Sequence, residues 1–167
     1  MKRFLLFLLI IIATTEVSVG GVSRLWLPAF NENKGEVRCN VKSPVTSVAI
    51  EEIENCWSGK PVKINVQKRS NIKRDGFKIV DKKEYVEILS STDTGALYGV
   101  YELLRMEQTD RAITDKESAP AYSIRILNHW DNLDGTIERG YAGKSLWKWE
   151  ELPNKVSHRY KAYARAN

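Results

Sequence analysis

Apolar residues recur at helical spacing in a segment near the start of the chain. Ser43 offers a capping hydroxyl, and Pro44 follows at the position that becomes the first residue of a helix. Gly59 and Pro61 then interrupt the pattern. The segment therefore predicts a helix that ends shortly before Gly59, with these residues on its apolar face: Val45, Val48, Ala49, Ile53 and Cys56.

A second helical pattern covers residues 94–107, with Ser91 or Thr92 as its cap. Gly95 and Gly99 lie four residues apart on this helix. Their spacing fits neither common nucleotide-binding fingerprint, so it favours close packing of the helix against a sheet instead. The predicted buried stripe consists of Leu97, Val100, Tyr101, Leu104 and Gln108.

Alternating apolar and polar residues predict strands around these helices. Residues 62–66 place Val62, Ile64 and Val66 on one face, and 77–80 and 85–89 are two further strands joined by a polar turn. Residues 24–30 begin a first strand or an extended arm. The order of strand, helix, three strands and helix predicts an α/β fold, a small sandwich domain over 21–108 with two helices on a mostly antiparallel sheet.

A polar stretch, 109–121, ends in Ala-Pro-Ala and is predicted to be a linker to a second unit, 122–167. That unit opens with an apolar strand over 122–127. Ser157 is a capping residue for a last helix over 158–166, with Tyr160, Tyr163 and Ala164 on one face.

The first twenty residues have the pattern of a secretory signal peptide. Lys2 and Arg3 precede an apolar run, 4–13, that is too short to span a bilayer, and small residues follow at Ser18 and Gly20. The alternative is that these residues remain on the protein as an uncleaved membrane anchor. The pattern predicts a secreted or periplasmic protein. Export permits a disulfide between the two cysteines, Cys39 and Cys56, although an unpaired cysteine is also a common core residue.

Composition narrows the class of protein. Hydrophobic residues make up 43% of the chain and charged residues 28%, which is typical of a globular protein, and the net charge is +5. The densest basic region, 60–74, contains no aromatic residues, which argues against nucleic-acid binding and favours a solvated edge strand and turn. Neither zinc-ligand spacing nor a Ser-His-Asp or Cys-His set is evident.

The highest concentration of aromatic, carboxylate and other polar side chains follows the apolar run 122–127. An aromatic plate, several carboxylates and a guanidinium are typical of a sugar-binding surface, because sugars stack their C–H faces on rings and need polar partners for their hydroxyls. His129 is either a proton shuttle or, more in keeping with buried polar groups, a hydrogen-bonded structural residue. Asp131 and Asp134 either contact sugar or close turns on their own backbone. The loop contains His129, Trp130, Asp131, Asn132, Asp134, Glu138 and Arg139.

The sequence NHWDNLDGTIERGYAGKSLW, with RYKAYARAN after it, resembles the start of the catalytic barrel of the family 67 glycoside hydrolases, which are α-glucuronidases. Upstream, DGFKI and SSTDTGALYGVYELLR resemble the small domain that precedes that barrel. The resemblance implies that 122–167 is the first βα unit of a truncated (β/α)8 TIM barrel. It also implies a secreted enzyme that hydrolyses α-1,2-linked (4-O-methyl)glucuronic acid from xylo-oligosaccharides, by inversion and without a cofactor.

The resemblance further implies which residues bind substrate. Arg139 gives a sugar carboxylate planar two-point contact, or it pairs with Glu138 or Asp134 to hold the loop. No catalytic residue is assigned here, because the resemblance puts the general acid and the water-activating carboxylates on later barrel strands. The predicted pocket wall comprises Trp130, Asp131, Asn132, Glu138, Arg139 and Trp147.

The resemblance implies xylan-derived oligosaccharides carrying glucuronic acid as partners, with no nucleic acid and no membrane anchor once the signal is removed. Whether the full-length enzyme forms a homodimer is left open. The last helix stops in mid-pattern at Asn167, so the chain is expected to be an amino-terminal portion, inactive alone and with a mobile or aggregation-prone final third. The alternative is a non-catalytic glycan-binding or scaffold module. A hexosaminidase-type enzyme is disfavoured because the 128–135 loop fits α-glucuronidases better.

Overall fold

A computed structural model describes residues 35–68, 70–137, 141 and 143–166. The predicted signal peptide, 1–20, and the predicted arm, 24–30, lie outside the described residues. Within the described part, no helix is long and apolar enough to cross a membrane. The elements in chain order are β1 (Val37–Cys39), α1 (Pro44–Cys56), β2 (Val62–Val66), β3 (Phe77–Asp81), β4 (Val86–Ser90), α2 (Asp93–Gln108), β5 (Lys116–Ser118) and α3 (His158–Ala166).

Both long helices begin where the capping residues predict. The Ser43 hydroxyl accepts a hydrogen bond from the Thr46 N–H (3.2 Å), and the Thr46 hydroxyl accepts one from the Ser43 N–H (2.8 Å), which forms a reciprocal capping box. At α2 the Thr92 hydroxyl accepts from the Gly95 N–H (3.1 Å), so Thr92 rather than Ser91 is the cap. The predicted ranges of α1 and α2 are confirmed to within two residues.

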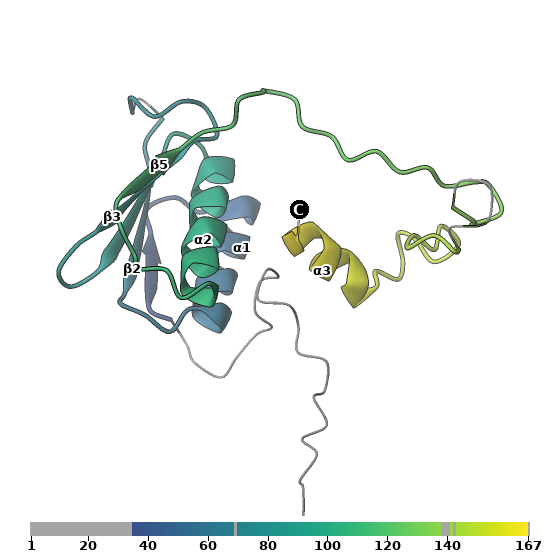
Figure 1. Ribbon diagram of the computed structural model, residues 1–167, viewed down its shortest axis with the longest axis horizontal. Helices are drawn as coiled ribbons and strands as arrows, with labels where there is room; N and C mark the ends of the chain where they lie inside the picture. The colour runs from purple at the N-terminus through teal and green to yellow at the C-terminus, as the bar shows by residue number, and fades with distance from the viewer. Residues whose placement is uncertain (1–34, 69, 138–140, 142, 167) are drawn as a thin grey trace, which may run out of the picture.

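The five strands form one mixed sheet in the order β1-β2-β4-β3-β5, with α1 and α2 on one face (Figure 1). The β1–β2 and β2–β4 pairs are parallel, whereas β3 is antiparallel to both β4 and β5. The prediction of a mostly antiparallel sheet was therefore wrong. Helix α1 returns the chain so that β2 runs in the same direction as β1, and β4 inserts between β2 and β3.

The predicted linker, 109–121, contains the edge strand β5, which pairs with β3. Three mostly polar residues carry no alternating pattern, so the strand was not predicted. The Lys116 ammonium contacts the Glu102 carboxylate on α2, as does the Arg105 guanidinium (2.6 Å). Partial burial raises the pKa of Glu102, but the hydrogen bonds from Arg105 and Lys116 outweigh it and hold that pKa below its usual value.

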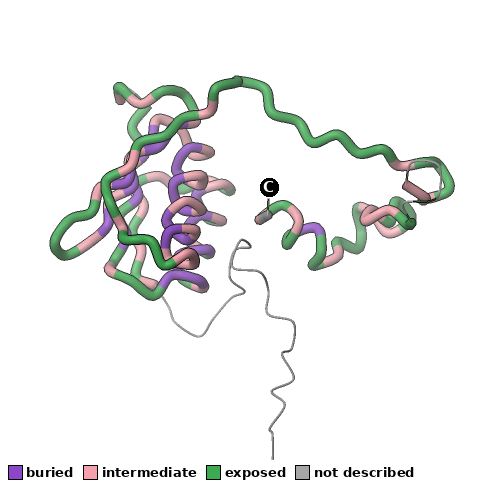
Figure 2. The backbone as a smooth tube through the Cα atoms, viewed as in Figure 1, coloured by how far each residue is buried: buried purple, intermediate pink, exposed green. Residues whose placement is uncertain are grey.

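The hydrophobic core lies between the sheet and the two helices, where Figure 2 shows the buried segments together. Helix α2 faces the sheet with its small residues, and Leu97 and Tyr101 are only half-buried, so the predicted stripe was partly wrong. A Cβ on Gly99 would lie 2.6 Å from the Ile88 side chain, which confirms the close packing predicted for the glycines. The buried residues of α2 are Gly95, Ala96, Gly99, Val100, Leu103, Leu104 and Met106.

Residues 122–127 are extended but form no strand, contrary to prediction. Ile124 and Ile126 are 74% and 83% exposed, and this part of the chain arcs away from the sheet in Figure 2. In the described part of the chain no strand lies alongside to supply ladder hydrogen bonds. Arg125 connects this segment to the sheet domain, because its guanidinium donates to the Asp75 carboxylate (3.0 Å) and to the Tyr98 hydroxyl (3.3 Å).

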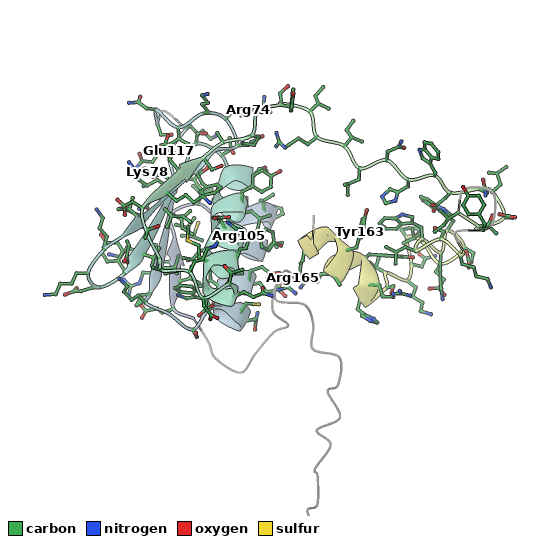
Figure 3. All side chains as sticks on the ribbon, viewed as in Figure 1. Arg74, Lys78, Arg105, Glu117, Tyr163 and Arg165 are labelled. Atoms are coloured by element: carbon green, nitrogen blue, oxygen red, sulfur yellow. The ribbon has the colours of Figure 1, made fainter. Side chains whose placement is uncertain are left out.

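Helix α3 brings the end of the described chain back to α1 (Figure 3). Arg165 reaches the buried carboxylate of Glu52, with Nη2 2.9 Å from Oε2. The Arg165 Nε also donates to the Glu52 Oε2 (3.1 Å). The other carboxylate oxygen, Oε1, lies 2.8 Å from Nε and takes part in the ion pair, but it accepts no hydrogen bond of good geometry. One turn earlier, Lys161 pairs with the exposed Glu51 (2.7 Å). These contacts join residues more than a hundred positions apart.

Neither cysteine forms a disulfide, so the structure contains no Cys39–Cys56 bridge. Burial, followed by the nearby Glu52 carboxylate, raises the pKa of Cys56 to about 11, whereas Cys39 is partly exposed. Because the thiolate is the nucleophile, we expect iodoacetamide at pH 8 to label Cys39 and to spare Cys56 until the protein unfolds. Peptide mass mapping checks this expectation, and equal labelling of the two thiols in folded protein would contradict it.

Candidate functional site

The loop that follows 122–127 folds around a cavity of about 420 Å³. Two short bridges shape the loop, between Asp131 and Ile137 and between Thr136 and Lys144. Gly135 takes a positive φ of 77° at the turn, a conformation that favours glycine. The cavity is lined by Asn128, His129, Trp130, Asp131, Ile137, Leu146 and Trp147.

Trp147 is the centre of an aromatic cluster that fixes the loop against α3. Its ring lies 4.7 Å from the Tyr160 ring and 6.1 Å, edge to face, from the Tyr163 ring. His129 meets Trp147 edge to face at 5.3 Å. The Tyr160 hydroxyl also accepts a hydrogen bond from the Lys148 N–H (2.8 Å). Such ring contacts stabilise by about 0.5–1.5 kcal/mol each, so the aromatic face of α3 supports the cavity wall.

The carboxylates of the loop bind its own chain. Asp134 accepts hydrogen bonds from the Thr136 N–H (2.9 Å) and hydroxyl (2.7 Å), and these bonds hold the pKa of Asp134 below its ordinary value. The Asp131 carboxylate accepts from the Ser145 hydroxyl, which in turn accepts from the Trp147 N–H (2.9 Å). Asp134 therefore closes a turn, as one of the two interpretations predicted, and Asp131 ties the two sides of the loop together.

The six predicted site residues fall into three groups. Trp130, Asp131 and Trp147 line the cavity, and Trp130 is 68% exposed. Asn132 does not line it; its side chain donates to the Thr136 hydroxyl (2.8 Å) within the turn. Glu138 and Arg139 lie outside the described residues.

Sequence reasoning missed part of the cavity wall. Asn128, Ile137 and Leu146 line it, and Ser145 holds Asp131. Of the two tryptophans near the end of the loop, only Trp147 was predicted to line the pocket. Trp147 does so, whereas Trp149 is 61% exposed and lies outside the lining.

The side chains that line the cavity are of the kinds that bind a ligand. An exposed indole offers a stacking plate, and Asn128 and His129 offer donors and acceptors to hydroxyl groups. No group of three or more His, Cys, Asp or Glu side chains that could hold a metal occurs among the described residues. The described loop carboxylates, Asp131 and Asp134, are engaged with Ser145 and Thr136, respectively.

Comparisons with known proteins identify the family. The family model "Glycosyl hydrolase family 67 N-terminus" matches residues 35–103, and the model "Glycosyl hydrolase family 67 middle domain" matches residues 104–167. The chain is similar to a probable alpha-glucuronidase A of Aspergillus terreus, 32% identical over 152 residues, which cover 90% of this chain and 17% of that protein.

Two further relatives come from the same genus. A probable alpha-glucuronidase A of Aspergillus clavatus is 34% identical over 149 residues, which cover 87% of this chain and 16% of that protein. An alpha-glucuronidase A of Aspergillus tubingensis is 43% identical over 74 residues, which cover 44% of this chain and 9% of that protein. The chain thus spans about a sixth of the length of the first relatives it matches. With both family models matching in tandem from residue 35 onward, the chain belongs to glycosyl hydrolase family 67.

Proposed function

We propose that the chain is the amino-terminal part of a secreted α-glucuronidase. The enzyme hydrolyses α-1,2-linked (4-O-methyl)glucuronic acid from xylo-oligosaccharides and inverts the anomeric centre. The printed names of the relatives support the glucuronidase activity, and the leader pattern of residues 1–20 supports secretion.

The observation that carries this proposal is the cavity of the 128–147 loop. It places the Trp130 and Trp147 rings beside Asn128 and His129 in about 420 Å³, which falls within the usual range for small-molecule sites. In the proposed enzyme this loop is one wall of the sugar pocket. Trp130 stacks on the C–H face of a sugar, and Arg139 holds the glucuronate carboxylate by two-point contact.

The proposed enzyme takes its general acid and base from residues outside this loop. An inverting glycosidase needs two carboxyl groups about 6.5–9.5 Å apart across the scissile bond, one of them protonated at neutral pH. Asp134 does not suit the role of acid, because its two bonds from Thr136 lower its pKa. Asp131 is held by Ser145. Both carboxylates therefore shape the loop.

The first test compares two proteins on an aldouronic oligosaccharide. We expect the 167-residue chain to release no glucuronic acid, whereas the product of the complete gene releases it with inversion. High-performance anion-exchange chromatography measures the free acid, and NMR of early product identifies its anomer. Turnover by the 167-residue chain would contradict the assignment of the acid and base. Binding without turnover by the complete gene product would favour the glycan-binding module.

A further inference from the structure

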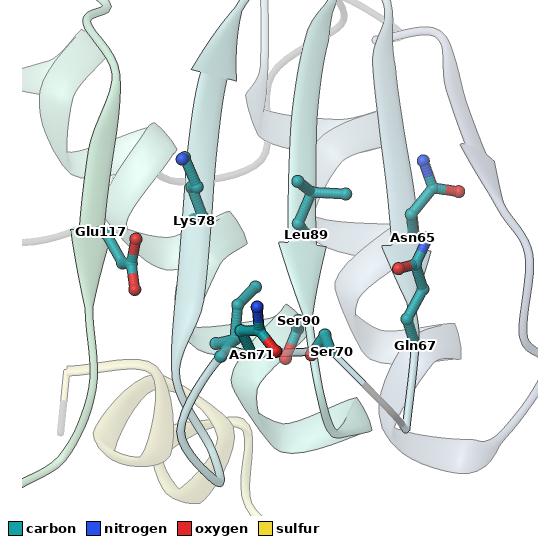
Figure 4. Close-up of a pocket in the computed structure, with 9 residues that line it drawn as sticks. Asn65, Gln67, Ser70, Asn71, Lys78, Leu89, Ser90 and Glu117 are labelled. Carbon is teal, nitrogen blue, oxygen red and sulfur yellow. The ribbon is translucent and has the colours of Figure 1, made fainter.

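A second cavity lies on the opposite side of the molecule's sheet from α1 and α2, far along the chain from the 128–147 loop (Figure 4). Strand register places four side chains in a single row across it: Asn65 on β2 is opposite Leu89 on β4, Leu89 is opposite Lys78 on β3, and Lys78 is opposite Glu117 on β5. Three strand spacings make this row about 14 Å long. The described helices α1 and α2 lie on the other face, and the four residues of the row are partly or fully exposed.

The connection between β2 and β3 forms one wall of this cavity and is held at both ends. The Gln67 N–H donates to the Ser90 carbonyl (2.8 Å), and the Gly76 N–H donates to the Lys73 carbonyl (2.9 Å). The Ser91 hydroxyl donates to that same Lys73 carbonyl (3.0 Å). Because these bonds hold Gln67 and residues 73–76 in the free protein, less ordering is required there when a ligand enters.

The wall also contains a hydroxyl that lacks a hydrogen-bond partner among the described residues. Ser70 lines the cavity, and its buried Oγ makes no hydrogen bond with any described residue. A buried hydroxyl without a partner is costly, so this oxygen needs a polar partner that the described residues do not supply. Asn65 is oriented as well, because its amide donates to the Glu87 carboxylate (2.7 Å) and so leaves its oxygen to accept.

The lining selects one class of ligand. Three amides, those of Asn65, Gln67 and Asn71, supply donors and acceptors together, as vicinal hydroxyls require, while Leu89 offers an apolar surface to a C–H face. Lys78 and Glu117 form no ion pair within the described part of the chain, and their charges cancel, which disfavours phosphate and nucleic acid. The volume, about 380 Å³, lies at the small end of the range for ligand sites.

We propose that this row, Asn65–Leu89–Lys78–Glu117 with the wall formed by Gln67, Ser70 and Asn71, is a second sugar site that binds neutral pyranose units of an oligosaccharide. Its role is to hold unsubstituted sugar units of the oligosaccharide while the 128–147 loop engages the acidic sugar. The ligand class follows from the lining alone, whereas the choice of a xylose oligomer as probe rests on the proposed function.

The test is an NMR titration of the ¹⁵N-labelled 167-residue chain with xylotriose. We expect saturable shifts of the side-chain NH2 signals of Asn65, Gln67 and Asn71, with a dissociation constant in the millimolar range because the floor is aliphatic rather than aromatic. Asn71→Ala and Gln67→Ala, both at exposed positions, are each expected to weaken binding about fivefold. Asn154→Ala removes another exposed amide, outside the cavity, and is the matched control.

Three outcomes would overturn the proposal. One is the lack of saturable shifts at these amides, another is an equal loss of binding in Asn154→Ala, and the third is stronger binding of inorganic phosphate than of xylotriose. A separate titration with glucuronic acid, followed at the indole N–H signals of Trp130 and Trp147, tests sugar binding at the 128–147 loop. Shifts at the sheet amides without shifts at those indoles would count against the proposed function and leave the second site standing, and the reverse result would do the opposite.

Discussion

Replacing Arg165 with alanine is expected to lower the free energy of unfolding by about 3–5 kcal/mol, because the buried Glu52 carboxylate then loses its cationic partner. The Glu52 side chain is 1% exposed, and Arg165 supplies the cation that faces it (2.8 Å). A carboxylate left without its cation in this position either stays ionised at high cost or takes up a proton. Urea unfolding followed by circular dichroism measures the change.

The same helix offers a matched control. Lys161 pairs with Glu51 at 2.7 Å, but both side chains are 47% exposed, so Lys161→Ala is expected to cost less than about 1 kcal/mol. The double variant Glu52→Leu/Arg165→Leu should regain most of the loss, since no charge is then buried. Equal effects of Arg165→Ala and Lys161→Ala would show that the pair does not join α3 to α1.

Shortening Ile53 to alanine is expected to lower the free energy of unfolding by about 2–5 kcal/mol. Ile53 is fully buried on the face of α1 that contacts the core, where the surrounding residues belong to α2 and the sheet and collapse only partly into a new void. The fall should appear as a lower urea midpoint with an unchanged slope.

Ile50→Ala is the control on the same helix. Ile50 is only partly buried, so the same change of side chain should cost about 1 kcal/mol there. Both substitutions replace isoleucine by a better helix former, and the difference between them therefore reports burial alone. A similar loss for the two variants would mean that the core does not lie where α1 and the sheet place it.

The helices and most strands were predictable because their signals are local. Ser43 and Thr92 cap their helices, and alternation located β2 to within its observed bounds. The pairing of the strands was not predictable, because the pattern of β2 is the same whether its neighbour runs parallel or antiparallel. The packing of Gly95 and Gly99 against the sheet was predictable, whereas Leu97 and Tyr101 were wrongly assigned to the buried face of α2.

The candidate site was predictable as a type of chemistry but not as geometry. The density of Trp, Asp and Asn after residue 127 indicated a sugar surface, and three of the predicted residues share a cavity. That Asn132 instead closes a turn depends on its hydrogen bond to Thr136, which composition does not reveal. The contact between Arg165 and Glu52 joins elements whose intervening chain gives no sign of their meeting.

The measurement that most directly tests the sugar-binding role of the 128–147 loop is the kcat/KM of two tryptophan variants in the complete gene product. Trp130 and Trp149 are 68% and 61% exposed, but only Trp130 lines the cavity. On an aldouronic oligosaccharide, Trp130→Ala should lower kcat/KM about tenfold, mainly through KM, and Trp149→Ala less than about twofold. Equal values for the two variants, or wild-type protein that releases no glucuronic acid, would contradict the account.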